Sequence, residues 1–284
     1  MGPTAQILGD RLHLQHGPID LIIGADGARE QAFAAARARF ETVLEELVAE
    51  LDLLRTPIGP ETPHPLGETA QRMMAAGKGL AGTGFITPMA GVAGAVAETV
   101  LQAMTHAADL SRAYVNNGGD IALYLSPGAA FKMAMVGHDG TTLGHIRISH
   151  KDTIRGIATS GRHGRSLSRG IADSVTVLAA TAATADVAAT LIANAVDVAD
   201  DPAIRRQRAC DLDETSDLGA RLVVTGCGQL SANAIETALS NGQALAQNFT
   251  TNGYINGACL FLQGHPRVIG HSPVTLSQGT PEYA

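Results

Sequence analysis

The chain has 284 residues, of which 45% are hydrophobic, so it is long enough to bury a full core. Aromatic residues make up only 4% and tryptophan is absent, which predicts a core built mainly from alanine, valine, leucine and isoleucine. The net charge of −7 at pH 7 is opposite in sign to that of a typical phosphate-backbone binder, so nucleic acid is not an expected partner.

The cysteines Cys210, Cys227 and Cys259 are odd in number and form no C-x-x-C pair. They predict neither a zinc site nor a disulfide framework, and they fit a reducing compartment. The N-terminal residues show no secretory signal, and no apolar run reaches the about 18 residues of a membrane span. We therefore expect a soluble, cytoplasmic protein without a membrane partner.

The first elements predicted are two short strands at 6–8 and 11–15, joined by a glycine–aspartate hairpin signal, and an extended segment at 20–23. Apolar residues then recur at helical spacing and predict a long helix over 28–55. A proline-rich surface connection separates this helix from a shorter one at 68–76.

The next segment, Gly77 to Gly82, reads G-K-G-L-A-G and formally matches the dinucleotide fingerprint. That fingerprint requires a preceding strand and a following helix. Here a helix precedes and an apparent strand, Gly84 to Met89, follows. We therefore predict a flexible or close-packed glycine loop.

The remaining pattern repeats a strand–helix–strand unit, with single strands between and after the two copies. Strands are predicted at 84–90, 112–125, 131–137, 145–149, 157–160, 174–179, 219–225 and 258–263, and helices at 92–109, 183–197 and 231–248. The strands cluster at hairpin-like spacing and the helices do not alternate strictly with them. This predicts one α+β domain over 1–271 with antiparallel sheets packed against helices, followed by a loose tail at 272–284.

Three segments carry residues suited to chemistry, and the first is YVNNGGDIALYL. It places Gly118 and Gly119 between Asn117 and Asp120. Paired glycines let the backbone bend sharply and let a ligand approach main-chain N–H groups. A β-bulge with polar turn residues explains the same spacing.

The second segment, ATADVAATL, places Asp186 and Thr190 four residues apart on a predicted helix, where they share a face. A carboxylate and a hydroxyl are hard oxygen ligands, which magnesium prefers when a phosphate completes its shell. Alternatively, Asp186 only complements the helix dipole and Thr190 bonds to the backbone one turn earlier.

The third segment, ATSGRHGRSLSRG, is a loop that combines Ser160 and Gly161 with a histidine and three arginines. These four are His163, Arg162, Arg165 and Arg169. Backbone amides and guanidinium groups of such a loop can hold phosphates, whereas a solvated surface loop is the simpler alternative.

Four motifs, taken in chain order, resemble the ApbE-like superfamily, whose best-known members are FAD:protein FMN transferases. These motifs are N-x-G-G-D-I, T-S-G, S-V-T-V and A-D-x-x-A-T. The A-G-A-V-A-E stretch at 93–98 looks like that family's K-G-y-a-v-D helix start. The resemblance covers roughly residues 84–198 and looks closest to the shorter, uncharacterised branches. It implies an α+β fold related to the T-fold, with a flavin nucleotide and an acceptor flavoprotein as partners; a homo-oligomer is left open.

The resemblance also implies a site, position by position. Magnesium ligands are implied at Asp186, at Thr190 and at a backbone carbonyl near Val92. Flavin-nucleotide contacts are implied at Asn117, Gly118, Gly119, Asp120, Ser160 and Gly161. Arg162 and Arg165 are candidates to stabilise phosphate charge, and His163 and Asp173 are candidate general bases.

The chain departs from the family between its S-G element and its S-V-T-V strand. Transferases carry H-x-x-D-P-x-T-G there, whereas this chain lacks the D-P-x-T-G core over 162–173. Ala93 replaces the family lysine and Glu98 the aspartate. Magnesium-dependent FMN transfer from FAD, or FAD pyrophosphate cleavage, is one expectation. The others are a different small-molecule substrate on the same scaffold, a flavin- or nucleotide-binding protein without catalysis, and a scaffold protein with no small ligand.

Overall fold

The computed structural model describes residues 2–270 and 273–277, and its largest element is a nine-stranded sheet. Its strands, in chain order, are β1 (Thr4–Leu8), β2 (Arg11–His16), β3 (Ile19–Gly27), β4 (Leu110–Asn117), β5 (Asp120–Leu125), β8 (Gly156–Ser160), β9 (Ser174–Ala179), β12 (Gly257–Leu262) and β13 (His265–Gly270). Their order across the sheet is β1-β2-β3-β4-β5-β8-β9-β12-β13.

A second sheet has three strands in the order β14-β7-β6, and a separate two-stranded ribbon is formed by β10 and β11. These strands are β6 (Ala130–Val136), β7 (Thr142–Ser149), β10 (Ile204–Arg208), β11 (Leu222–Cys227) and β14 (Val274–Leu276). Every strand pairing among the described residues is antiparallel, and the predicted α+β class is confirmed.

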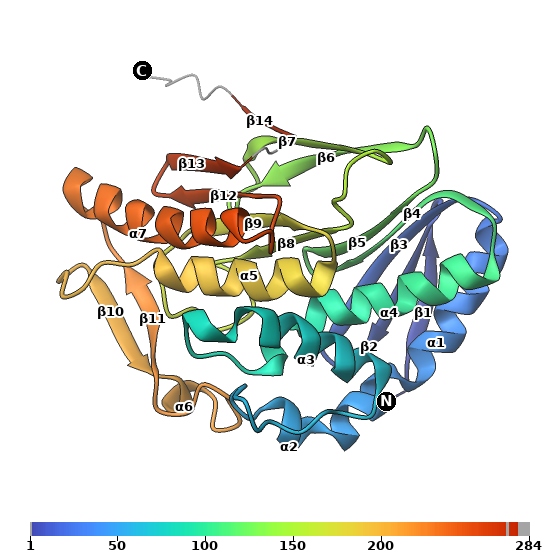
Figure 1. Cartoon of the computed structure of the whole chain (residues 1–284), viewed down its shortest axis with the longest axis horizontal. Coiled ribbons are helices and arrows are strands. Elements are labelled where there is room, and N and C mark those ends of the chain that lie inside the picture. Colours follow the sequence, from blue (N-terminus) through green and yellow to red (C-terminus); the bar gives the residue numbers. More distant parts are fainter. Residues whose placement is uncertain (1, 271–272, 278–284) are drawn as a thin grey trace.

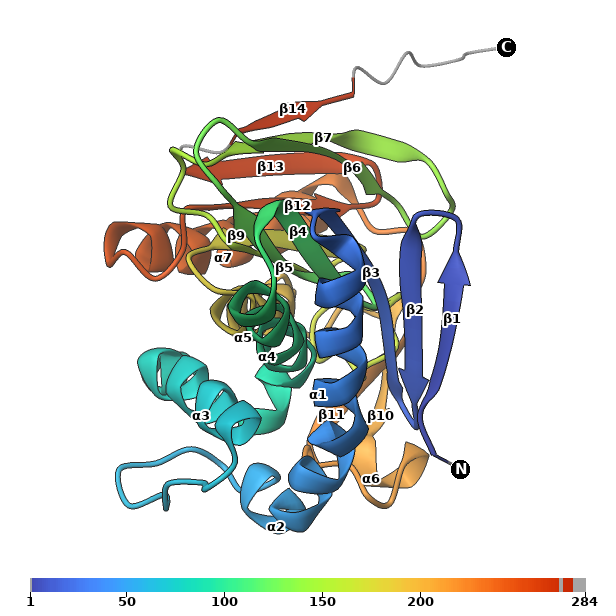
Figure 2. The same ribbon diagram turned by 90° about the vertical axis from the view of Figure 1, so that its right-hand side faces the viewer.

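The helices gather on one face of the large sheet, and the small sheet covers part of the other face (Figures 1 and 2). The helices are α1 (Arg29–Ala49), α2 (Leu51–Leu54), α3 (Glu68–Leu80), α4 (Val92–Ala107), α5 (Ala182–Ala195), α6 (Ala209–Leu212) and α7 (Ala232–Thr251), with 3₁₀ turns η1 (Ala81–Thr83) and η2 (Pro88–Gly91). The main core lies between the helices and the large sheet, and it is rich in alanine, as the composition predicts.

Side chains alternate along each strand, so strand position decides which core a residue joins. On β5, Ala122 packs into the helix-facing core, whereas Leu123 and Leu125 belong to a second cluster beneath the small sheet. On β8, Ala158 faces the helices and Ile157 faces the small sheet.

The predicted helix over 28–55 is broken at Glu50, whose φ of −113° and ψ of 14° are not helical. The Glu50 carboxylate accepts the backbone N–H groups of Leu66 and Gly67, each at 2.7 Å. A tertiary contact of the side chain thus coincides with the helix end, which apolar spacing alone does not reveal.

The predicted glycine loop and the strand after it are wrong. Gly77 lies inside α3, where a Cβ atom would come within 2.2 Å of Ile58, so the glycine serves close packing. Residues 84–87 form no strand and lead into η2. The predicted strand over 112–125 is two strands joined by a turn.

The C-terminal segment differs in part from the predicted loose tail. Residues 274–276 form β14, which pairs with β7, and Val274 and Leu276 pack against the cluster beneath the small sheet. The rest of the predicted tail, apart from residues 273 and 277, lies outside the described residues. Within the described residues no single helix is long and apolar enough to cross a membrane, and only the bent pair Glu68–Thr83 and Pro88–Ala107 passes such a test, broken by 115°.

Candidate functional site

The glycine pair forms the two-residue turn of the β4–β5 hairpin. Gly118 and Gly119 have φ values of +65° and +115°, and Asn117 pairs with Asp120 across the turn. Two positive φ angles in a row are what a tight hairpin of this twist requires, which explains why glycine stands at both positions. The Asn116 side chain closes the turn by accepting the Gly119 N–H at 2.8 Å.

Helices α4 and α5 meet at their first turns, and each supplies a carboxylate to the other. Asp186 on α5 accepts the Gly94 N–H at 3.0 Å, and Glu98 on α4 accepts the Ala183 N–H at 2.8 Å. A Cβ atom on Gly94 would lie 2.3 Å from the Ala182 carbonyl oxygen, so only glycine permits this approach. Asp186 therefore caps a neighbouring helix rather than its own.

Asp120 and Asp186 face each other across the helix-facing side of the sheet. Asp120 lies two residues before Ala122 on β5 and so shares its helix-facing side. Burial raises the pKa of Asp120 to about 7, although the Thr159 N–H and the charge of Arg165 oppose the shift. Burial, and then the negative charge of Asp120, raise the pKa of Asp186 well above its ordinary value.

This carboxylate pair has no ion-pair partner among the described residues. Two carboxylates that repel each other and form no ion pair among the described residues are a chemical environment that fits a divalent cation, although the charge of Arg165 acts on Asp120 from a greater distance. No group of three or more histidine, cysteine or acidic side chains converges anywhere in 2–270 and 273–277. The protein would thus supply two carboxylates, and phosphate, hydroxyl or carbonyl oxygens would complete a magnesium shell.

The other two implied metal ligands lie on the same pair of helices. Thr190 follows Asp186 by one turn of α5 and is half-buried. Val92 is the first residue of α4 and is also half-buried. The next carbonyl, that of Ala93, accepts the side-chain amide of Asn117 at 3.2 Å, which ties the glycine turn to the start of α4. Asn117 is only 3% exposed.

Arg165 reaches the glycine turn from the loop after β8. Its guanidinium lies so close to Gly118 that a Cβ atom there would come within 2.1 Å of Nη2. The same group donates to the Pro18 carbonyl at 3.3 Å, and its charge lowers the pKa of Asp120. Of the predicted phosphate-contacting residues, Arg165 is therefore placed beside the carboxylate pair.

Arg162, His163 and Asp173 form a separate cluster. Asp173 Oδ1 accepts from Arg162 Nε at 3.0 Å and from Nη2 at 2.6 Å, and it lies 3.4 Å from His163 Nε2. Its other oxygen accepts the Gln263 N–H. The His163 ring stacks on His138 with centroids 3.7 Å apart. None of these contacts joins His163 or Asp173 to the carboxylate pair.

Ser160 and Gly161 lie at the end of β8. Ser160 shares the helix-facing side of the strand with Ala158 and is half-buried. Gly161 has a φ of +151°, and a Cβ atom there would lie 2.6 Å from the Asp173 carbonyl oxygen. Close packing against the backbone of Asp173 is thus sufficient to explain why glycine stands in the S-G element, and no ligand contact is needed for that explanation.

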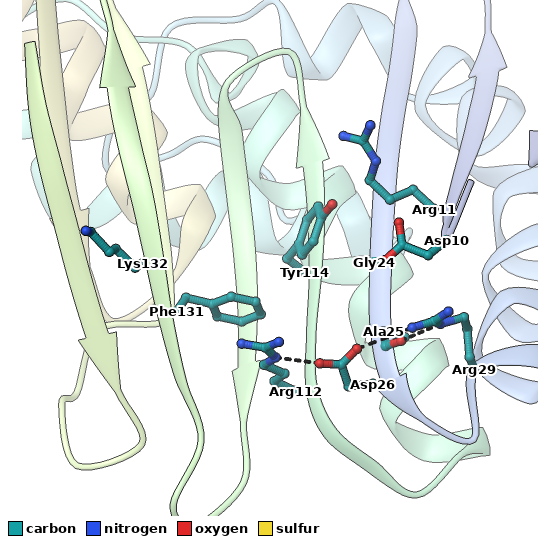
Figure 3. Close-up of a pocket in the computed structure, with 10 residues that line it drawn as sticks. All are labelled: Asp10, Arg11, Gly24, Ala25, Asp26, Arg29, Arg112, Tyr114, Phe131 and Lys132. Carbon is teal, nitrogen blue, oxygen red and sulfur yellow. Dashed lines mark hydrogen bonds and ion pairs between the residues drawn. The ribbon is translucent and has the colours of Figure 1, made fainter. Parts of the chain in front are cut away.

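A depression of about 190 Å³ on the opposite face of the sheet was not expected from the sequence (Figure 3). Tyr114 lies over Gly24 there, and its ring meets Phe131 edge to face at 6.0 Å. Asp26 is engaged by Arg112 at 2.6 Å and by Arg29 at 3.4 Å. The Asp26 carboxylate is therefore already paired, and Asp10, which also lines the depression, is an exposed turn residue, unlike the half-buried carboxylates of the helix-facing side.

The fold and the paired helix starts define an ApbE-like α+β protein, and comparison with known proteins agrees. The family model described as "AbpE bacteria" matches residues 4–268, and the chain therefore belongs to this family. A crystal structure of the ApbE protein from Thermotoga maritima shares the fold with a TM-score of 0.52, at 11% identity over 94% of this chain and 97% of that one.

Sequence relatives place the chain in the UPF0280 branch. It is 36% identical over 144 residues to a UPF0280 protein of Methanopyrus kandleri, covering 50% of this chain and 57% of the relative. It is 33% identical over 172 residues to a UPF0280 protein of Methanosarcina acetivorans, covering 60% and 64%. The matched region thus spans less than two thirds of either relative.

Proposed function

We propose that this chain is a magnesium-dependent enzyme of flavin nucleotides that cleaves the pyrophosphate of FAD and passes FMN to a protein hydroxyl or to water. The observation that carries the proposal is the Asp120–Asp186 carboxylate pair beside the glycine turn, in which neither carboxylate forms an ion pair among the described residues. Membership of an ApbE-like family supports flavin as the nucleotide.

Phosphoryl transfer needs positioning and charge stabilisation more than covalent help from the protein. Magnesium, when bound, would neutralise charge on the phosphoryl oxygens of the transition state. Asp120 and Asp186 would hold the ion, with the Thr190 hydroxyl one turn away. Arg165 beside Gly118 would bind a phosphate oxygen.

In the proposed reaction the acceptor oxygen forms a bond to the FMN phosphorus, and the bond from that phosphorus to the bridging oxygen breaks. The electron pair of the broken bond leaves with AMP, and the acceptor proton passes to a base. His163 remains the predicted base, because burial and the charges of Arg162 and His138 lower the pKa of its imidazole. Asp173 is a weaker candidate because both of its oxygens accept protein hydrogen bonds.

Because both oxygens of Asp173 already accept hydrogen bonds, a second candidate function is favoured. If the 162–173 loop is a structural cluster rather than a catalytic one, the chain binds a flavin or another nucleotide without cleaving it. A different substrate on the same scaffold is compatible with the loss of the D-P-x-T-G core.

The test is incubation with FAD, Mg²⁺ and a candidate acceptor protein, read by AMP release and by the intact mass of the acceptor. Asp186→Asn should abolish Mg²⁺-dependent AMP release. Glu98→Gln is the matched control, since it alters the reciprocal helix cap without touching the carboxylate pair. Flavin binding without AMP release would favour the second candidate, and failure to bind FAD would contradict both.

A further inference from the structure

The three arginines of the 158–170 segment lie in three different surroundings. Arg162 is held by Asp173 and Arg165 lies at Gly118, whereas the Arg169 backbone N–H donates to Asn194 near the C-terminal end of α5. Arg169 lines an open depression of about 380 Å³. The lining residues are Arg169, Asn194, Asp197, Arg206, Arg221 and Leu222, which we call the arginine pocket.

Arginines from three separate segments line this pocket, and the guanidinium groups of two of them are anchored. Arg206 on β10 donates to Asp197 Oδ1 at 2.6 Å and to the Arg169 carbonyl at 2.7 Å. Arg221 stacks over the Phe85 ring with its guanidinium carbon 3.3 Å from the centroid. Stacking fixes the direction of this guanidinium, whose Nη1 also donates to the Leu218 carbonyl at 3.2 Å.

The third arginine, Arg169, is positioned by a backbone hydrogen bond rather than by an ion pair. The Arg169 N–H donates to Asn194 Oδ1 at 2.9 Å, while its side chain forms no ion pair among the described residues. Asp197 is the only carboxylate lining the pocket. Three cations against one anion is a local excess of positive charge in a chain whose net charge is −7.

We propose that the arginine pocket is a binding site for a phosphate-bearing ligand. Guanidinium forks match the oxygens of a phosphate group, and a bound anion would offset the excess positive charge of the three arginines that line the pocket. This inference does not depend on the proposed flavin reaction.

The pocket is distinct from the carboxylate pair but connected to it along one helix. Asp186, Thr190 and Asn194 recur every four residues and form a polar stripe on α5, whose other positions are largely buried apolar residues. Eight residues of helix separate Asp186 from Asn194, which is about 12 Å. One phosphate group cannot reach both ends, so the pocket takes a second anionic group, from a separate metabolite or from the same nucleotide.

The test is titration of the full chain with inorganic pyrophosphate in metal-free buffer containing a chelator, followed by calorimetry. Wild type should bind, and Arg169→Gln should weaken the affinity at least about tenfold, as loss of charge-assisted hydrogen bonds does. Arg205→Gln is the matched control, because it removes the same charge from β10 at a residue that lies over Gly226. Asp186→Asn should leave pyrophosphate binding unchanged.

A parallel titration with FAD and Mg²⁺ separates the two sources of phosphate. If Arg169→Gln weakens pyrophosphate binding alone, the pocket serves a separate metabolite; if it weakens both, the pocket receives part of the flavin nucleotide. Equal pyrophosphate affinity in Arg169→Gln and Arg205→Gln, or no binding by wild type at millimolar concentration, would overturn the proposal.

Discussion

Two charged clusters of the protein differ in how their charges are satisfied. In the 162–173 loop, Arg162 and Asp173 pair at 2.6 Å and a backbone N–H occupies the second carboxylate oxygen. At the start of α5, Asp186 and Asp120 face each other, and neither has an ion pair among the described residues.

This difference separates a structural role from a functional one. A matched ion pair with satisfied hydrogen bonds stabilises a loop and leaves little capacity for a ligand. Two unmatched carboxylates cost stability, and that cost persists in a protein when another requirement, such as a bound cation, outweighs it. The carboxylate pair therefore has more capacity for a ligand than the predicted bases in the loop.

The largest effect is expected from Asp173→Ala, which should reduce the free energy of unfolding by about 3 kcal/mol because Arg162 and the Gln263 N–H lose their acceptor. Urea denaturation measures the change. Asp26→Ala breaks the more exposed ion pair with Arg112 and should cost at most about 1 kcal/mol. If the loop is structural only, Mg²⁺ affinity of the folded Asp173→Ala protein should be unchanged.

Asp186→Asn should have the opposite effect and raise the free energy of unfolding of the metal-free protein at pH 8. Both carboxyl groups have pKa values above 3.8, the ordinary value. Below about pH 4 both are protonated and cost the folded state no stability, whereas their ionisation lowers the free energy of unfolding as the pH rises toward 7. We expect a gain of about 1–2 kcal/mol, reduced by solvent screening of half-buried groups. Thermal unfolding in chelator at pH 4 and pH 8 measures it. A loss of stability at pH 8 would mean that helix capping outweighs the repulsion.

Mg²⁺ affinity should depend on pH through the same groups. Because the pKa of Asp120 is about 7, a proton competes with the cation below that pH. Affinity should fall about tenfold per pH unit below 7 for one displaced proton. Calorimetry in two buffers of different ionisation enthalpy counts the protons released. Constant affinity between pH 6 and pH 8 would remove Asp120 from the cation site.

The smallest effect on stability is expected from Gly118→Ala, at about 1 kcal/mol for a non-glycine residue at positive φ. Gly140→Ala is the matched control, since Gly140 has a φ of +83° and open space around its Cβ position. Both variants should unfold at similar urea concentrations. Only Gly118→Ala should weaken FAD binding, because its methyl group would displace the Arg165 guanidinium.

Much of the fold could be predicted because local patterns dominate it. The β1–β2 hairpin, α4, α5, α7 and strand β9 lie close to their predicted ranges. Strand β10, with the sequence IRRQR, has no apolar alternation and was not predicted, and β14 is too short to show a pattern. Both are defined by hydrogen bonds to a partner strand, which a local pattern does not contain.

The sequence by itself determined the helix and strand order, the glycine turn at 118–119, the shared face of Asp186 and Thr190, and the resemblance to an ApbE-like family. Only the tertiary structure decided which charges meet. In the folded structure Asp173 pairs with Arg162, the charge of Asp120 acts on Asp186, and Arg169 lines a pocket with Arg206 and Arg221. The physical reason is that electrostatic energy depends on separation in space, whereas helical and strand periodicity depend only on separation along the chain.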